Sequence, residues 1–185
     1  MTKIIEALDR LSEWTGHILS KASLGIMAIT VLVVVIRYGF QSGHITLGGL
    51  RISSIALQES VMYLHAMLFM LASAYTLKHD AHVRVDVFYR RFSPRAKALV
   101  DLSGTLLLLF PACGFILYIS LDFVDFAWNM KERSGESEGL AYVYLLKTLI
   151  PVMAVLLLLQ GIAEALRSLI VLKGVAPDDR EVSRI

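Results

Sequence analysis

Residues Leu102–Leu121 read LSGTLLLLFPACGFILYISL and contain no charged side chain over twenty positions. A helix rises about 1.5 Å per residue, so a segment of this length reaches about 30 Å, the thickness of the hydrocarbon core of a bilayer. The stretch is therefore long and apolar enough to cross a membrane as a helix. Pro111 lies inside it and predicts a local kink, because proline removes a backbone hydrogen bond.

Three other segments share this length and apolar character. Together with the first they predict four transmembrane helices, over residues 18–40, 54–77, 99–121 and 144–170. The chain has 185 residues, of which 56% are hydrophobic, whereas roughly 45–50% is usual for a soluble domain. The sequence therefore predicts an all-α membrane protein with a four-helix membrane domain over residues 18–172.

The two ends of the chain flank this domain. Residues 1–17 predict a short amphipathic helix, because apolar side chains recur at helical spacing. They are Ile4, Ile5, Leu8, Leu11 and Trp14. Trp14 would lie at the level of the lipid headgroups. Residues 173–185 are predicted to form a cytoplasmic tail.

The distribution of Lys and Arg predicts the orientation. Thirteen lie in the N-terminal segment, the connection after the second span and the C-terminal segment. Five lie in or beside the other two connections: Arg37, Arg51, Lys131, Arg133 and Lys147. Because positive residues favour the cytoplasmic face, both termini are predicted to be cytoplasmic.

The connection between the second and third spans predicts a cytoplasmic interfacial helix. Its apolar residues stand at i, i+3, i+4 and i+7. They are Val85, Phe88, Tyr89 and Phe92. A short strand is the alternative, because residues 82–87 alternate polar and apolar. Ser93 and Pro94 predict the N-cap and first residue of the next helix.

Several function classes are excluded. A single cysteine, Cys113, allows neither a disulfide framework nor a multi-cysteine zinc site, and a net charge of +2 gives no nucleic-acid footprint. No phosphate loop, HExxH motif or nucleophile elbow occurs, so catalytic residues, metals and cofactors are not expected. The histidine and aspartate run His79, Asp80, His82 and Asp86 has no matching second ligand group.

The second span carries the polar residues that need an explanation inside a membrane. Most share one helical stripe, and such a stripe predicts contact between helices, with a proton relay through Glu59 and His65 as the alternative. The stripe consists of Ser54, Gln58, Met62, His65, Phe69, Ala72 and Thr76. Glu59 lies beside it and is predicted to pair with Arg51 or Lys147.

Small residues predict close approach of the last two spans. The fourth span has Ala154, Gly161 and Ala165 on one face. The third has Gly104, Leu108 and Ala112 on one face. We therefore expect a compact unit whose task is contact with other proteins.

Several motifs resemble one family. They are Arg37-Tyr38-Gly39-Phe40, Gln58-Glu59-Ser60, Ala74-Tyr75-Thr76-Leu77 with His82-Val83-Arg84-Val85-Asp86, Ser93-Pro94-Arg95 and Leu146-Lys147-Thr148-Leu149-Ile150-Pro151. Over about residues 10–172 the chain resembles the small membrane subunit of tripartite ATP-independent periplasmic (TRAP) transporters, the DctQ-like family. Many members open the second helix with Trp and two acids, whereas this chain has Ala56, Gln58 and Glu59.

The resemblance implies a scaffold for a large DctM-like membrane subunit in a bacterial inner membrane. That subunit would carry a small organic acid, delivered by a periplasmic substrate-binding protein, by a sodium-driven elevator motion. Substrate-binding residues would then lie outside this chain. Residues expected to contact a subunit or lipid are Trp14, Arg37, Glu59, His82, Arg84, Asp86 and Lys147. His82, Arg84 and Asp86 would order the inner connection, and Glu59 would lie near the binding protein.

Two other classes remain as alternatives. The chain could be a self-sufficient small proton-coupled exporter or channel, which predicts transport by this chain alone. It could also be a membrane-anchored electron carrier, although axial histidines at matching depth are missing from the sequence.

Overall fold

The computed structural model describes residues 2–47, 49–81, 89 and 91–174. In chain order the elements are α1 (Thr2–Val34), the π-helical turn η1 (Val35–Gly39), β1 (His44–Leu47), β2 (Leu50–Ser53), α2 (Ser54–Lys78), α4 (Pro94–Gly104), the π-helical turn η2 (Thr105–Leu109), α5 (Phe110–Asn129) and α6 (Val143–Leu172). They contain four helices that are long and apolar enough to span a membrane. The prediction of four helices able to span a membrane is confirmed.

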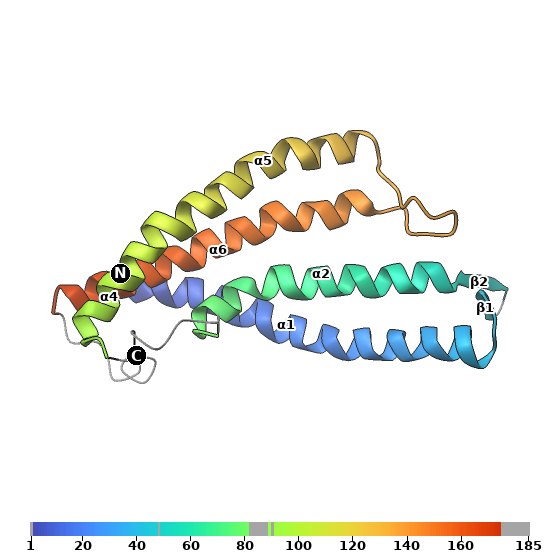
Figure 1. The fold of residues 1–185 in the computed structure, drawn as a ribbon, viewed down its shortest axis with the longest axis horizontal. Coiled ribbons are helices and arrows are strands. Elements are labelled where there is room, and N and C mark those ends of the chain that lie inside the picture. The colour runs from blue at the N-terminus through green and yellow to red at the C-terminus, as the bar shows by residue number, and fades with distance from the viewer. Residues whose placement is uncertain (1, 48, 82–88, 90, 175–185) are drawn as a thin grey trace.

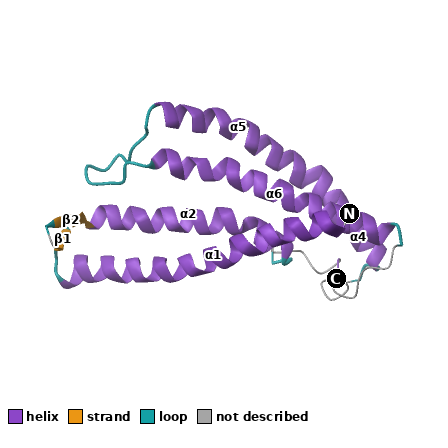
Figure 2. Cartoon of the chain, turned by 180° about the vertical axis from the view of Figure 1, so that it is seen from behind, coloured by secondary structure: helices purple, strands orange, loops and turns teal. Residues whose placement is uncertain are grey.

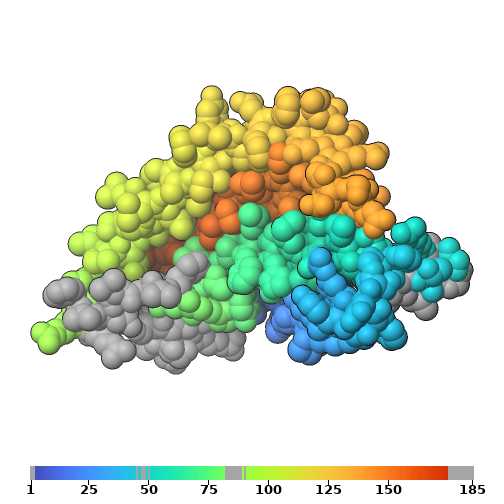
Figure 3. Space-filling model, turned by 45° about the vertical axis from the view of Figure 1, so that its right-hand side comes forward, coloured from blue at the N-terminus to red at the C-terminus, as the bar shows by residue number. Residues whose placement is uncertain are grey.

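The long helices lie side by side in the order α1, α2, α6, α5 (Figure 1). The space-filling view shows α2 between α1 and α6, and α5 beyond α6 (Figure 3). We call the end where α1 begins and α2 and α6 end the terminal end, and the end with β1 and β2 the hairpin end (Figure 2). The first part of α1 also packs against α6 at the terminal end.

Side-chain caps explain where two helices begin. Ser53 Oγ accepts a hydrogen bond from the Ile55 N–H at 3.1 Å at the start of α2. Ser93 caps α4 in the same way, and Pro94 occupies its first turn. Both arrangements satisfy backbone N–H groups that have no partner within the helix. The predicted start of the third helical segment is thus confirmed.

The first helix is longer than the predicted span. It runs from Thr2 without a break across the expected boundary at residues 17 and 18, so the amphipathic segment is the first half of α1. With η1 the helical segment is 37 residues from Lys3, or about 55 Å, longer than a bilayer core is thick. Ile5 and Leu19 are buried in it, whereas Trp14 is 65% exposed.

A two-stranded antiparallel hairpin joins α1 to α2, which the all-α prediction did not include. His44 pairs with Ser53 and Leu47 with Leu50. Gly49 has φ of +89° in the turn, a conformation that glycine adopts without strain. Two consecutive glycines, at 48 and 49, were the sequence signal for this turn.

The small face of the fourth span is buried as predicted, with Ala154 fully covered and Ala165 8% exposed. A Cβ added to Gly161 would lie 2.4 Å from Leu109 Cδ2, so glycine allows close packing here.

The predicted face of the third span is wrong, because Leu108 is 72% exposed. The π-helical turn η2, just before Pro111, has more residues per turn than an α-helix and so shifts the residues that follow to another side.

The predicted interfacial helix and the alternative strand both fall mainly on residues 82–88 and 90, outside the described residues. Tyr89 and Phe92, which are described, have rings 6.4 Å apart. The Tyr89 hydroxyl donates a hydrogen bond to Asp101 Oδ2 at 2.7 Å. This bond ties the segment between α2 and α4 to α4.

Candidate functional site

A polar cluster ties α1 to α6 at the terminal end. Arg167 Nη2 lies 2.5 Å from both carboxylate oxygens of Asp9, and its Nη1 donates to Glu164. Ser12 Oγ donates to Gln160 Oε1 at 2.7 Å, and both residues are buried. Since each of these polar groups has a partner, the cluster holds charge inside the protein without leaving it uncompensated.

The same end ties α1 to α2 through a buried lysine. The Lys78 side chain is only 4% exposed, and its Nζ lies 2.7 Å from Glu13 Oε1. Nζ also donates to the carbonyl oxygen of Asp9 at 3.2 Å. His79 Nε2 lies 2.9 Å from the same Glu13 oxygen. One acidic residue of α1 therefore holds the end of α2.

At the hairpin end, Glu59 of α2 holds the connection between α5 and α6. It accepts hydrogen bonds from Ser134 Oγ and, at 2.5 Å, from the Leu140 N–H. The predicted partners of Glu59 are wrong, since Arg51 pairs with Glu138 and Lys147 pairs with Glu132. One donor that reaches Glu59 is the backbone N–H of Leu140 in a folded loop. Sequence spacing cannot reveal such a donor, because every residue except proline has a backbone N–H.

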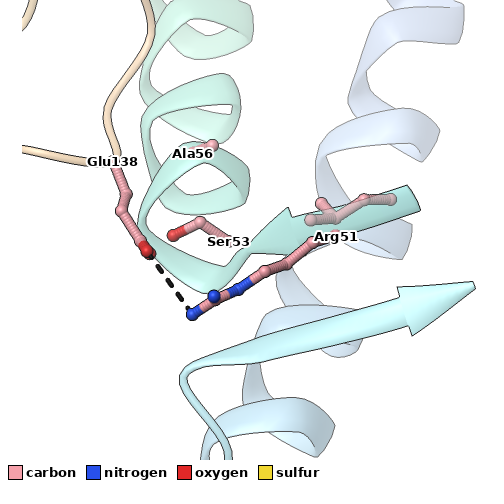
Figure 4. Close-up of a pocket in the computed structure, with 5 residues that line it drawn as sticks. Arg51, Ser53, Ala56 and Glu138 are labelled. Carbon is pink, nitrogen blue, oxygen red and sulfur yellow. Dashed lines mark ion pairs between the residues drawn. The ribbon is translucent and has the colours of Figure 1, made fainter. Parts of the chain in front are cut away.

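The predicted contact residue Lys147 and the predicted Glu59 partner Arg51 are also engaged within the chain. Lys147 Nζ lies 2.5 Å from Glu132 Oε2 and 4.0 Å from the centre of the Phe123 ring. Arg51 reaches Glu138 across a shallow pocket of about 440 Å³ that Ser53 and Ala56 also line (Figure 4). The Arg51 nitrogen and the Glu138 oxygen are 3.7 Å apart, with both side chains largely exposed. This pair is a weak surface contact.

Removing the Glu59 carboxylate is expected to free the connection it holds. In Glu59→Ala the Leu140 N–H and the Ser134 hydroxyl lose their acceptor, a loss of about 1–3 kcal/mol for a partly buried group. Opening of the loop should therefore be more frequent, and trypsin cleavage after Lys131 or Arg133 should be roughly tenfold faster. Glu138→Ala, which loses only a solvated pair, should be cleaved at the parent rate. Equal rates for the two variants would contradict the role of Glu59.

A groove lies between α1 with η1 and α2, and we call it the α1–α2 groove. Its lining includes Thr30, Val33, Arg37, Gln58, Met62 and His65, and it encloses about 610 Å³. Arg37 Nη1 donates to Gln58 Oε1 at 2.8 Å, which connects η1 to α2. The polar stripe of α2 was predicted to face protein. Ser54 is buried, whereas Gln58, Met62, His65 and Phe69 are exposed, and the first three of these line the groove.

No three His, Cys, Asp or Glu side chains gather as metal ligands within the described ranges. The predicted contact residues His82, Arg84 and Asp86 lie outside them.

The family model of the DctQ component of tripartite ATP-independent periplasmic transporters matches residues 26–170. The chain belongs to the DctQ family. Searches of curated proteins and of solved structures find no match to it. The match runs from the second half of α1 almost to the end of α6, so this DctQ chain is a small membrane subunit of a TRAP transporter and a component of a transporter family.

Asp9, Glu13, Lys78, Gln160 and Arg167 of this DctQ chain did not emerge from its sequence as candidates. The spacing of Glu164 and Arg167, at i and i+3, was an available signal for one pair. The bonds from α1 join residues more than 60 positions apart, and local patterns do not predict such pairs.

Proposed function

We propose that this DctQ chain scaffolds a large DctM-like subunit in a bacterial inner membrane. The complex would take up a small organic acid, delivered by a periplasmic substrate-binding protein, with a sodium gradient as the driving force. Solute and sodium would bind to the large subunit. The small subunit would hold the immobile part of its partner in place within the bilayer.

The observation that carries this proposal is the single layer of helices. α2 packs on α1 and α6, and α6 packs on α5, so along most of their length the helices stand in one row (Figure 1). A path for a polar solute needs protein on all sides, because lipid does not solvate polar groups. A row one helix thick offers a surface and not an enclosed path, which favours a scaffold over a self-sufficient channel.

The charge distribution supports a cytoplasmic terminal end. Thirteen of the eighteen Lys and Arg residues belong to the segments predicted to be inside. The hairpin end would then face the periplasm. The loop that Glu59 holds would lie on the side from which the binding protein approaches.

Reconstitution tests the proposal. The chain is coexpressed with the large membrane subunit from the same organism, purified in mild detergent and placed in vesicles with the binding protein. We expect the subunits to copurify, and uptake to require both subunits, the binding protein and an inward sodium gradient. Vesicles with this chain alone should show no flux above protein-free vesicles. Flux through the chain alone, or a large subunit that works fully without it, would overturn the proposal.

A further inference from the structure

The α1–α2 groove places a polar side chain near the middle of the bilayer. His65 is 11 residues after the start of α2 at Ser54 and 13 residues before its end at Lys78, about 17 Å and about 20 Å along the helix. Its side chain is exposed, and it lines the groove. If the groove faced lipid, the imidazole would lie in hydrocarbon, where an unpaired polar group is costly.

The hydrogen bond of His65 fixes which nitrogen needs a partner. Nδ1 lies 3.0 Å from the carbonyl oxygen of Val61, one turn earlier in the same helix. A carbonyl only accepts, so Nδ1 carries the proton of the neutral ring and Nε2 is left as an acceptor. Nε2 has no donor among the described residues. At this depth in a bilayer, a donor from another molecule would satisfy Nε2.

Arg37 adds a second requirement at the hairpin-side mouth of the groove. Its guanidinium has five N–H donors, and its exposed side chain gives one of them to Gln58. Arg37 belongs to the π-helical turn η1, and such turns occur frequently at functional sites. A carboxylate, or the free carbonyl groups at a helix C-terminus, would complement the remaining donors.

The middle of the opposite edge, from Thr105 to Leu121, carries no charged side chain and no histidine, and the exposed Asp122 and Asp125 of α5 lie nearer the hairpin end. On η2 and α5 the most exposed side chains include Leu107, Leu108, Phe115 and Tyr118, each between 65% and 75% exposed. This surface is suited to acyl chains. The contrast between this surface and the α1–α2 groove favours lipid over the middle of α5 and protein over the groove.

We infer that the α1–α2 groove is the docking site for a transmembrane helix of the large subunit. That helix would donate a hydrogen bond to His65 Nε2 and present acceptors to Arg37, with its apolar side chains on Met62 and Phe69. The inference rests on the proposed function, because it takes the large subunit as the occupant. It adds which face of this chain is used and which chemistry selects the partner helix.

Photocrosslinking in the assembled complex tests the docking face. A benzophenone amino acid replaces Met62 in the groove and, in a matched variant, Phe115 on α5. We expect an adduct with the large subunit from position 62 and none from position 115. An adduct only from position 115, or adducts from position 62 only with lipid or with a second copy of this chain, would overturn the inference. If the large subunit does not copurify, the proposed function is contradicted as well. If it copurifies but forms no adduct with position 62, only the inference about the docking face is contradicted.

Replacement of His65 supplies an independent measurement. His65→Leu should lower the affinity for the large subunit about threefold to tenfold, because it removes one interhelical hydrogen bond. His65→Gln, which keeps donors and an acceptor, should lose less. Because His65 is exposed and its hydrogen bond among the described residues is to its own helix, the unfolding midpoint of the isolated chain should not change. Unchanged affinity in His65→Leu, with Phe115→Leu as the matched control, would count against the inference.

Discussion

Arg167→Met is expected to lower the stability of the chain by about 3–5 kcal/mol, the usual effect of removing one partner from a largely buried ion pair. Arg167, Asp9 and Glu164 have side chains that are 17%, 19% and 26% exposed. Without the guanidinium, two carboxylates remain close together with Gln160 Nε2 as a donor at 3.4 and 3.2 Å. Thermal unfolding in detergent should show the midpoint falling by roughly 10 °C.

Two companion variants separate charge from packing. In Arg167→Met combined with Asp9→Asn and Glu164→Gln, no carboxylate is left uncompensated, so most of the lost stability should return. Arg51→Met removes an arginine from the exposed pair with Glu138 and should change stability by less than about 1 kcal/mol. A single Arg167 variant as stable as the parent would show that the cluster does not hold α1 on α6.

Gly16→Ala is expected to separate α1 from α2 at the terminal end. A Cβ at Gly16 would lie 2.3, 2.6 and 2.7 Å from three carbons of the Tyr75 ring. The ring is also held by His79, whose centroid is 4.3 Å away, so it must move as a whole. Overpacking of this kind costs about 1–3 kcal/mol, more than the 0.5–1 kcal/mol that alanine gains over glycine in a helix. The unfolding midpoint should fall by several degrees.

Gly25→Ala is the matched control on the same helix. A Cβ there meets no atom within 4 Å, so only the helix-propensity gain applies and the midpoint should stay constant or rise. Both variants gain the same helix propensity, so the difference between their unfolding midpoints measures the clash with Tyr75 alone. Equal midpoints for the two variants would disprove the close approach of α1 and α2 at this point.

The sequence predicted the helical spans well, because a span is a local property. Length and hydropathy within residues 54–77 are enough to define α2, and Ser93 with Pro94 is enough to define where the next helix begins. Predictions that depended on helical phase were less secure. The face of Gly104, Leu108 and Ala112 was wrong because the π-helical turn η2 changes the phase within the span.

The functional surface was predicted only in part. Arg37 emerged as a contact residue, and the structure gives it Gln58 as a partner on the edge of a groove. Glu59 was recognised as important but assigned to the wrong partners, because its acceptor role is met by a loop N–H about 80 positions away. The contacts of Asp9 with Arg167 and of Glu13 with Lys78 at the terminal end were not predicted at all.

The sequence by itself determined that this chain crosses a membrane and belongs with a transporter. The length of an apolar segment and the residues of a motif are both local properties of the chain, so neither depends on how the helices pack. Only the tertiary structure decided the order α1, α2, α6, α5, the partners of each buried charge and the side of α2 that lies open. The physical reason is distance in sequence. Arg167 meets Asp9 only after the last and first helices have packed, and His65 faces outward because of where α1 and α6 lie against α2.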